Sequence, residues 1–157
     1  MAKVLVLGVG NPWRGDDGVG PAVIASLQGT LDGVMLEEAG APGLALVEMM
    51  LGLDRVVVVD ALVDESGPPG RVGIKTPEDF PAARPAANPH GAGLLDAMAF
   101  GRRVVPADMP RRLALVTVTI GPPGTGEGLS PPVAAAVTEA ADAVRRVLRE
   151  WEKEDNA

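Results

Sequence analysis

Apolar residues fall into runs and periodic stripes that predict alternating strands and helices along the chain. Continuous apolar runs rich in valine and leucine are typical of strands buried on both faces. Such runs predict strands over 3–9 and 55–60, and alternating apolar residues predict another over 112–120. Shorter apolar segments predict short strands over 33–38 and 71–75, the latter at a sheet edge. Apolar residues spaced by three and four positions predict helices over 18–29, 42–52 and 90–100. Ser130 as N-cap and Pro131 in the first turn open a last helix, whose apolar stripe ends at Trp151.

The order of these elements predicts the fold class. Strand, helix, strand, helix and strand at this spacing are typical of a parallel sheet with helices on both faces. We expect an α/β protein, a single three-layer α/β/α sandwich with a mainly parallel sheet that spans residues 1–157. The polar segment 152–157 is expected to fray, and the proline-rich segment 76–89 is expected to form a loop.

Composition and charge narrow the chemistry. The 157 residues carry a net charge of −7 at pH 7, so the chain lacks the basic surface that nucleic acid or an anionic membrane attracts. The absence of cysteine excludes disulfides, thiolate metal sites and a cysteine nucleophile. No apolar run approaches the roughly 18 residues of a membrane helix, and the first run is too short for a signal peptide. We expect a cytoplasmic protein that acts as a monomer, with no nucleic-acid or membrane partner.

Acidic residues follow two of the predicted central strands. In a parallel sheet, ligands bind beyond the carboxyl ends of the strands, near a switch in strand order. Asp16 and Asp17 follow the first strand, and Asp60 comes directly after four valines. One aspartate of the pair is explained as a helix N-cap, which leaves the other unexplained. Asp60 on its own fits a hydrogen-bonded strand terminus as well as a functional group.

His90, the single histidine, is the remaining candidate. It follows Pro89 at the start of a predicted helix, where the topology can bring it together with Asp17 and Asp60. A lone histidine is more often structural than catalytic, so the site depends on this convergence. Two carboxylates and one imidazole can bind a divalent metal, such as nickel, zinc, manganese or iron, and leave positions open for substrate or water.

Four sequence blocks resemble the hydrogenase maturation endopeptidases. The first, over residues 7–20, reads Leu-Gly-Val-Gly-Asn-Pro-Trp-Arg-Gly-Asp-Asp-Gly-Val-Gly. The others, in matching order and spacing, are Val59-Asp60-Ala61, Pro89-His90 with Leu94-Leu95, and Gly128-Leu129-Ser130-Pro131. The resemblance covers nearly the whole chain, and its first block is quite specific.

This resemblance implies an α/β/α sandwich and a peptidase. Such a peptidase removes a C-terminal extension from the large-subunit precursor of a [NiFe] hydrogenase once nickel is in place. The resemblance also implies that Asp17, Asp60 and His90 are the metal-binding and catalytic residues. The nickel is expected to come with the precursor, and no other cofactor is expected. One stretch departs from the family pattern Asp-Gly-Gly-Thr-x-Gly: it begins with Glu38 and lacks the threonine.

The mechanism stays open at the level of sequence. Nickel bound by Asp17, Asp60 and His90 can dock the scissile bond and activate water. Alternatively, one aspartate acts as general base in an aspartic-type hydrolysis. A non-catalytic, nickel-sensing chaperone of a precursor subunit would use the same three residues. Trp13, beside the proposed site, can contact a peptide or pack its own loop down.

Two other folds share parts of this pattern. Gly8 and Gly10 resemble a dinucleotide-binding fingerprint, but Trp13 stands where the third glycine belongs. Acids after the first and third strands also occur in phospho-acceptor receiver domains. In those domains a lysine ends the strand that corresponds to 112–120, and this chain has none there. Both alternatives therefore fit less well than the peptidase.

Overall fold

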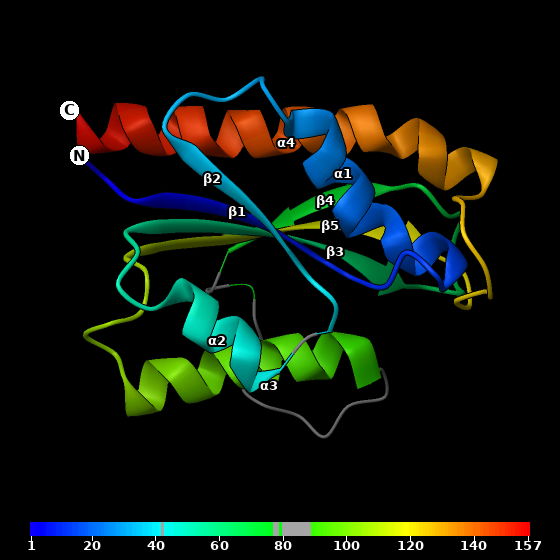
Figure 1. Cartoon of the computed structure of the whole chain (residues 1–157), viewed down its shortest axis with the longest axis horizontal. Helices are drawn as coiled ribbons and strands as arrows, with labels where there is room; N and C mark the ends of the chain where they lie inside the picture. Colours follow the sequence, from blue (N-terminus) through cyan, green and yellow to red (C-terminus); the bar gives the residue numbers. More distant parts are fainter. Residues whose placement is uncertain (42, 77–78, 80–88) are drawn as a thin grey trace.

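A five-stranded sheet forms the middle of the described molecule (Figure 1). The structure is a computed structural model that describes residues 1–41, 43–76, 79 and 89–157, with the backbone alone at 89–93 and 95. The strands are β1 Val4–Val9, β2 Val34–Ala39, β3 Arg55–Val63, β4 Val72–Lys75 and β5 Arg112–Ile120. Their order is β2-β1-β3-β5-β4. All neighbours are parallel except β4, an edge strand that pairs antiparallel with β5, so the predicted mainly parallel sheet is confirmed.

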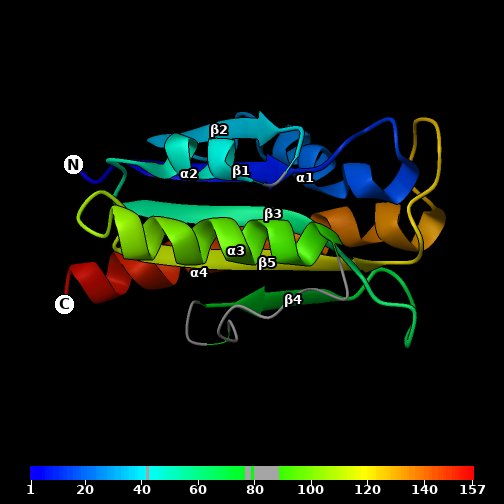
Figure 2. The same ribbon diagram turned by 90° about the horizontal axis from the view of Figure 1, so that it is seen from below.

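Helices cover both faces of this sheet. They are the short 3-10 helix η1 Gly15–Gly18, α1 Val19–Leu27, α2 Leu44–Met50, α3 Pro89–Val104 and α4 Pro131–Asp155. Helices α1 and α4 lie on one face, and α2 and α3 lie on the other (Figures 1 and 2). The α/β/α sandwich is therefore confirmed. None of the helices in the described part of the chain is long and apolar enough to cross a membrane. The loop predicted over 76–89 lies largely outside the described residues.

The core divides into two layers because successive strand residues point to opposite faces. In β3, Val57 and Val59 join the apolar cluster under α1 and α4. Val56 and Val58 join the cluster under α2 and α3. All four valines are fully buried, which explains why β3 reads as a continuous apolar run.

Helix α1 lies unusually close to the sheet, and glycine makes this approach possible. A Cβ atom on Gly20 would collide with the carbonyl oxygen of Val9 and lie 2.8 Å from that of Val59. On the strand, a Cβ atom on Gly8 would in turn collide with the backbone of Gly20. Two glycines of the first sequence block thus set how closely the first helix approaches β1 and β3.

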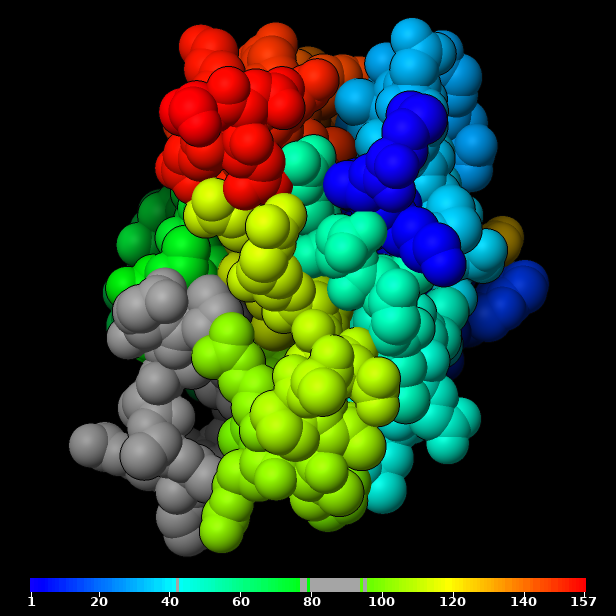
Figure 3. Space-filling model, turned by 90° about the vertical axis from the view of Figure 1, so that its left-hand side faces the viewer, coloured from blue at the N-terminus to red at the C-terminus, as the bar shows by residue number. Residues whose placement is uncertain are grey.

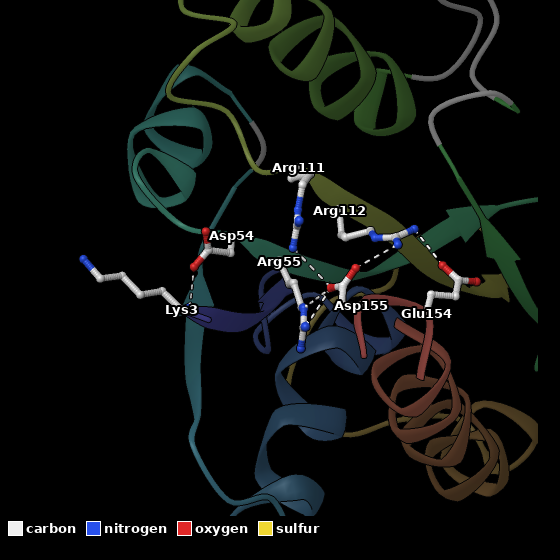
Figure 4. A network of polar contacts seen from close by, with 7 residues as sticks. All are labelled: Lys3, Asp54, Arg55, Arg111, Arg112, Glu154 and Asp155. Atoms are coloured by element: carbon white, nitrogen blue, oxygen red, sulfur yellow. Dashed lines mark hydrogen bonds and ion pairs between the residues drawn. The ribbon is translucent and has the colours of Figure 1, made fainter. Parts of the chain in front are cut away.

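An ion-pair network fixes the end of α4 to the amino-terminal ends of β3 and β5 (Figure 4). The Asp155 carboxylate accepts hydrogen bonds from Arg55, Arg111 and Arg112 at 2.7–3.2 Å. The end of α4 and the first residues of the chain both lie on this side (Figure 3), where they border one hollow of about 330 Å³. Of the segment 152–157 that is expected to fray, residues 152–155 belong to α4 in the structure.

Candidate functional site

The carboxyl ends of β1 and β3 form a switch point in the sheet. From β1 the chain passes through α1 to β2 on one side, and β3 lies on the other side of β1. Pairing between β1 and β3 ends at Gly8 and Val59. Beyond that pair the two strands no longer hydrogen-bond to each other, which leaves room for side chains between them.

Asp60 is the first residue of β3 beyond this pairing. The strand does not end there, as its acidic side chain suggested, but continues to Val63 because β5 still pairs with it. Asp60 lies opposite Thr117 of β5, and strand alternation turns its side chain toward the layer of α2 and α3. The residue is only 3% exposed.

The environment of Asp60 favours its neutral form. Burial raises the pKa of Asp60 from 3.8 to about 8, against the opposing effect of a backbone hydrogen bond at Ala61. The negative charge of Asp17 raises the pKa of Asp60 further. The two carboxyl groups are therefore close enough to interact electrostatically, although they are 43 residues apart in the sequence.

Asp17 reaches this place from η1, the turn of 3-10 helix that follows β1. Its side chain is 3% exposed, and its Oδ2 atom accepts a hydrogen bond of 2.9 Å from the backbone N–H of Asn11. Gly10 has a φ of 144°, and a Cβ atom there would collide with the carbonyl oxygen of Asp17. The glycine thus lets the loop fold back so that the carboxylate is held beside the strand end.

Asp16, the other acid of the pair, has a different task. Its Oδ1 and Oδ2 atoms accept hydrogen bonds of 2.7 Å from the backbone N–H and the hydroxyl of Ser130. Ser130 is the N-cap residue of α4, and Gly18 occupies that position in α1. The expectation that one aspartate caps its own helix is wrong, because Asp16 instead joins η1 to the start of α4.

His90 lies in the first turn of α3. This helix runs opposite to the parallel strands, so its first turn lies at the end of the sheet where β1 and β3 finish (Figure 2). The imidazole lies outside the described side chains, and the three-residue site therefore stays a prediction. Among the side chains that are described, no group of three acids or histidines converges on one point.

Other residues at this end were less visible in the sequence. Thr117 is 4% exposed and shares the sheet face of Asp60, since the two lie in register. Its polarity, which only Arg112 and Thr119 share within β5, was the available signal. Glu38, which departs from the family pattern, is exposed near the end of β2 opposite Gly8.

The chain is similar to known proteins both in sequence and in fold. A model of the hydrogenase maturation protease family matches residues 21–147. The hydrogenase 2 maturation protease of Escherichia coli K12 is 31% identical over 152 residues, which cover 94% of this chain and 92% of that protein. The solved E. coli hydrogenase maturating endopeptidase HybD has a TM-score of 0.81 at 31% identity, covering 94% of this chain and 93% of the other. The HybD protease from Thermococcus kodakarensis shares the fold, with a TM-score of 0.73 at 22% identity over 92% of this chain and 98% of the other.

Proposed function

The chain belongs to the hydrogenase maturation protease family, and from this membership we propose that it trims the large-subunit precursor of a [NiFe] hydrogenase. The chain is a peptidase. In our proposal it removes a C-terminal extension from that precursor after nickel insertion, and the nickel of the precursor is the feature that it recognises. The supporting observation is the pair of buried, interacting carboxyl groups at the switch point of the sheet.

The two carboxyl groups fit a divalent cation that arrives with the substrate. Asp17 and Asp60 are both buried, and the charge of one disfavours ionisation of the other. A cation would offset this repulsion and the burial of the charges. The imidazole of His90 is the proposed third ligand. Three such ligands leave the remaining positions of nickel to the groups of the precursor that already hold it.

Docking of nickel is expected to be coupled to the release of a proton. Asp60 is mostly protonated at neutral pH, because its pKa is about 8. A carboxyl group must lose its proton to bind a metal, so we expect nickel docking to release a proton from Asp60. A precursor without nickel would meet a neutral acid there, which gives the site a means of telling loaded from empty precursor.

Hydrolysis of the scissile amide needs a base for water and an acid for the leaving nitrogen. Water attacks the carbonyl carbon and gives up a proton, and the amide nitrogen must gain one as the C–N bond breaks. With nickel docked, the metal can polarise water or the carbonyl group while Asp17 and Asp60 hold it. In an aspartic-type route, a protonated Asp60 near neutral pH can donate to the nitrogen while a second carboxylate accepts the proton of water.

A cleavage assay with purified protein tests the proposed function. The substrate is the large-subunit precursor from the same source, prepared with and without nickel, and mass spectrometry reads its new C-terminus. We expect shortening of the nickel-loaded form only. Cleavage of both forms would refute recognition of nickel, and a stable complex without cleavage would favour the chaperone alternative.

Three substitutions test the site in the same assay. We expect Asp17→Asn, Asp60→Asn and His90→Ala each to abolish processing while the far-UV circular dichroism spectrum stays unchanged. Asp32→Asn is the matched control, because it removes one carboxylate from an exposed turn before β2. Normal processing by all three variants would refute the assignment of the site and leave the family membership intact.

A further inference from the structure

Trp13 projects from the loop that joins β1 to η1. Its side chain is 66% exposed, more than any other large apolar side chain in the described part of the chain after Met1. The second tryptophan, Trp151, is 9% exposed in the core under α4. Large aromatic side chains are usually well buried, and those left at a surface often mark a contact with another molecule.

The backbone beneath Trp13 is fixed on both sides. Its N–H donates a hydrogen bond of 2.9 Å to Oδ1 of Asn11, and its carbonyl accepts one of 2.8 Å from the N–H of Gly126. The N–H of Gly15 donates in turn to the carbonyl of Gly126 at 2.8 Å. The indole is therefore presented by a loop that is already ordered. The sequence-level alternative, in which Trp13 packs the loop down, does not fit its exposure.

Asn11 connects Trp13 to the proposed site. It accepts from the backbone of Trp13 through its side chain, and its own N–H donates to Oδ2 of Asp17. Asp17 comes four positions after Trp13, so their Cα atoms lie within about 14 Å of each other. A typical protein interface covers about 800 Å² on each partner, which corresponds to a radius of about 16 Å. A folded precursor seated over Asp17 would therefore cover Trp13 as well.

We propose that Trp13 is a docking residue for the hydrogenase precursor, whose apolar surface beside the cleavage site receives the indole. The inference rests on the proposed function and names a contact outside the metal-binding residues. A tryptophan on a hydrogen-bonded loop suits this role, because the backbone beneath it loses little conformational entropy when the indole is covered. Tryptophan is also among the residues that most often dominate the binding energy of an interface.

Steady-state kinetics with the nickel-loaded precursor test the proposal. We expect Trp13→Ala to raise KM by about ten- to thirty-fold, the size of a typical interface hot spot. The kcat should stay within about two-fold of wild type, because docking acts before the chemical step. Trp13→Phe should recover most of the loss. Phe100→Ala is the matched control: Phe100 is 48% exposed on α3, toward the other end of the sheet, and its loss should leave KM unchanged.

Fluorine NMR gives a readout that does not depend on cleavage. The chain labelled with 5-fluorotryptophan should show two resonances, since it contains two tryptophans. Adding unlabelled precursor should shift or broaden the Trp13 resonance and leave that of Trp151 in place.

The possible outcomes separate the docking role from the proposed function. An unchanged KM for Trp13→Ala, or a loss in kcat alone, would overturn the docking role while cleavage by the wild type upholds the function. Broadening of the Trp13 resonance with protein concentration, without precursor, would assign the indole to a contact between copies and overturn the proposal. A wild-type chain that neither binds nor cleaves the precursor would overturn the proposed function itself.

Discussion

Replacing Asp60 with asparagine should stabilise the protein while it abolishes processing. Asparagine has nearly the shape of a protonated aspartate, but it cannot ionise. Asp60 is 3% exposed, and burial is the largest cause that raises its pKa to about 8. Above the pKa that Asp60 has in the unfolded chain, the native state must hold either a buried charge or an extra proton, and both cost free energy.

The magnitude follows from the two pKa values. Between pH 3.8 and about 8 the native chain binds one proton more than the unfolded chain, so stability falls as pH rises. The slope is about 1.4 kcal/mol per pH unit. The advantage of Asp60→Asn over wild type should therefore grow from about 2 kcal/mol at pH 5.5 to a plateau of about 6 kcal/mol above pH 8. Below pH 3.8 the two proteins should be equally stable.

Urea unfolding at pH 5.5, 7 and 8.5 measures this difference. Far-UV circular dichroism reports the helices, and a chelator in every sample prevents metal ions from binding the carboxylates. Asp32→Asn again serves as the control, because it removes a carboxylate from an exposed turn instead of a buried strand. The quantity compared is the difference in free energy of unfolding between each variant and wild type.

Two outcomes would refute the reasoning. An advantage of Asp60→Asn that is equal at all three pH values would mean that ionisation of Asp60 is not what costs stability. A variant less stable than wild type at pH 8.5 would mean that the ionised carboxylate is held by a favourable partner. In either case the proton release proposed for nickel docking would lose its basis.

Three further predictions concern the frame around the site. Asp16→Ala should lower the free energy of unfolding by about 2 kcal/mol, because it removes two hydrogen bonds at the start of α4; an unchanged urea midpoint would contradict this. Asp155→Asn should lower Tm, because the carboxylate is held by arginines, and the hydrogen bond from Arg112 is the largest cause that lowers the pKa of Asp155. The difference in Tm from wild type should shrink with added salt and below about pH 4. A difference in Tm that persists in high salt would argue against ion pairing. Gly20→Ala should lower the free energy of unfolding by about 2–3 kcal/mol, because a Cβ atom has no room there. Gly40→Ala is the control and should change it by less than about 0.5 kcal/mol, because a Cβ atom there meets nothing. Equal shifts in Tm would contradict the close approach of α1.

The sequence predicts the sheet well because its strands carry an unambiguous apolar signal. The bounds of β5 agree with the predicted 112–120, and four valines identify β3. The predicted strand end was wrong where pairing with a neighbouring strand overrides the residue type. Asp60 suggested the end of β3, but the pairing with β5 carries the strand to Val63. The helical end of α4 depends on arginines at least 43 residues away, whose proximity to Asp155 no local pattern contains.

The candidate site was predictable in position and only partly in detail. The rule that ligands bind beyond parallel strand ends pointed to Asp17 and Asp60, and the structure brings these residues close enough to interact. The role of Asp16 was not predictable, because its partner Ser130 is 114 residues away. The raised pKa of Asp60 was also hidden, since it depends on how deeply neighbouring layers bury the side chain.

Two adjacent aspartates have different roles because η1 points them in different directions. Successive residues of a 3-10 helix are about 120° apart around its axis, so neighbouring side chains cannot share one target. Asp16 joins the start of α4, and Asp17 turns inward and contributes to the raised pKa of Asp60. Holding a carboxylate at a place that disfavours charge requires a frame that cannot relax away from it. Asp16 supplies one fixed point of that frame at Ser130, and Gly10 supplies the other by letting the loop close over Asp17.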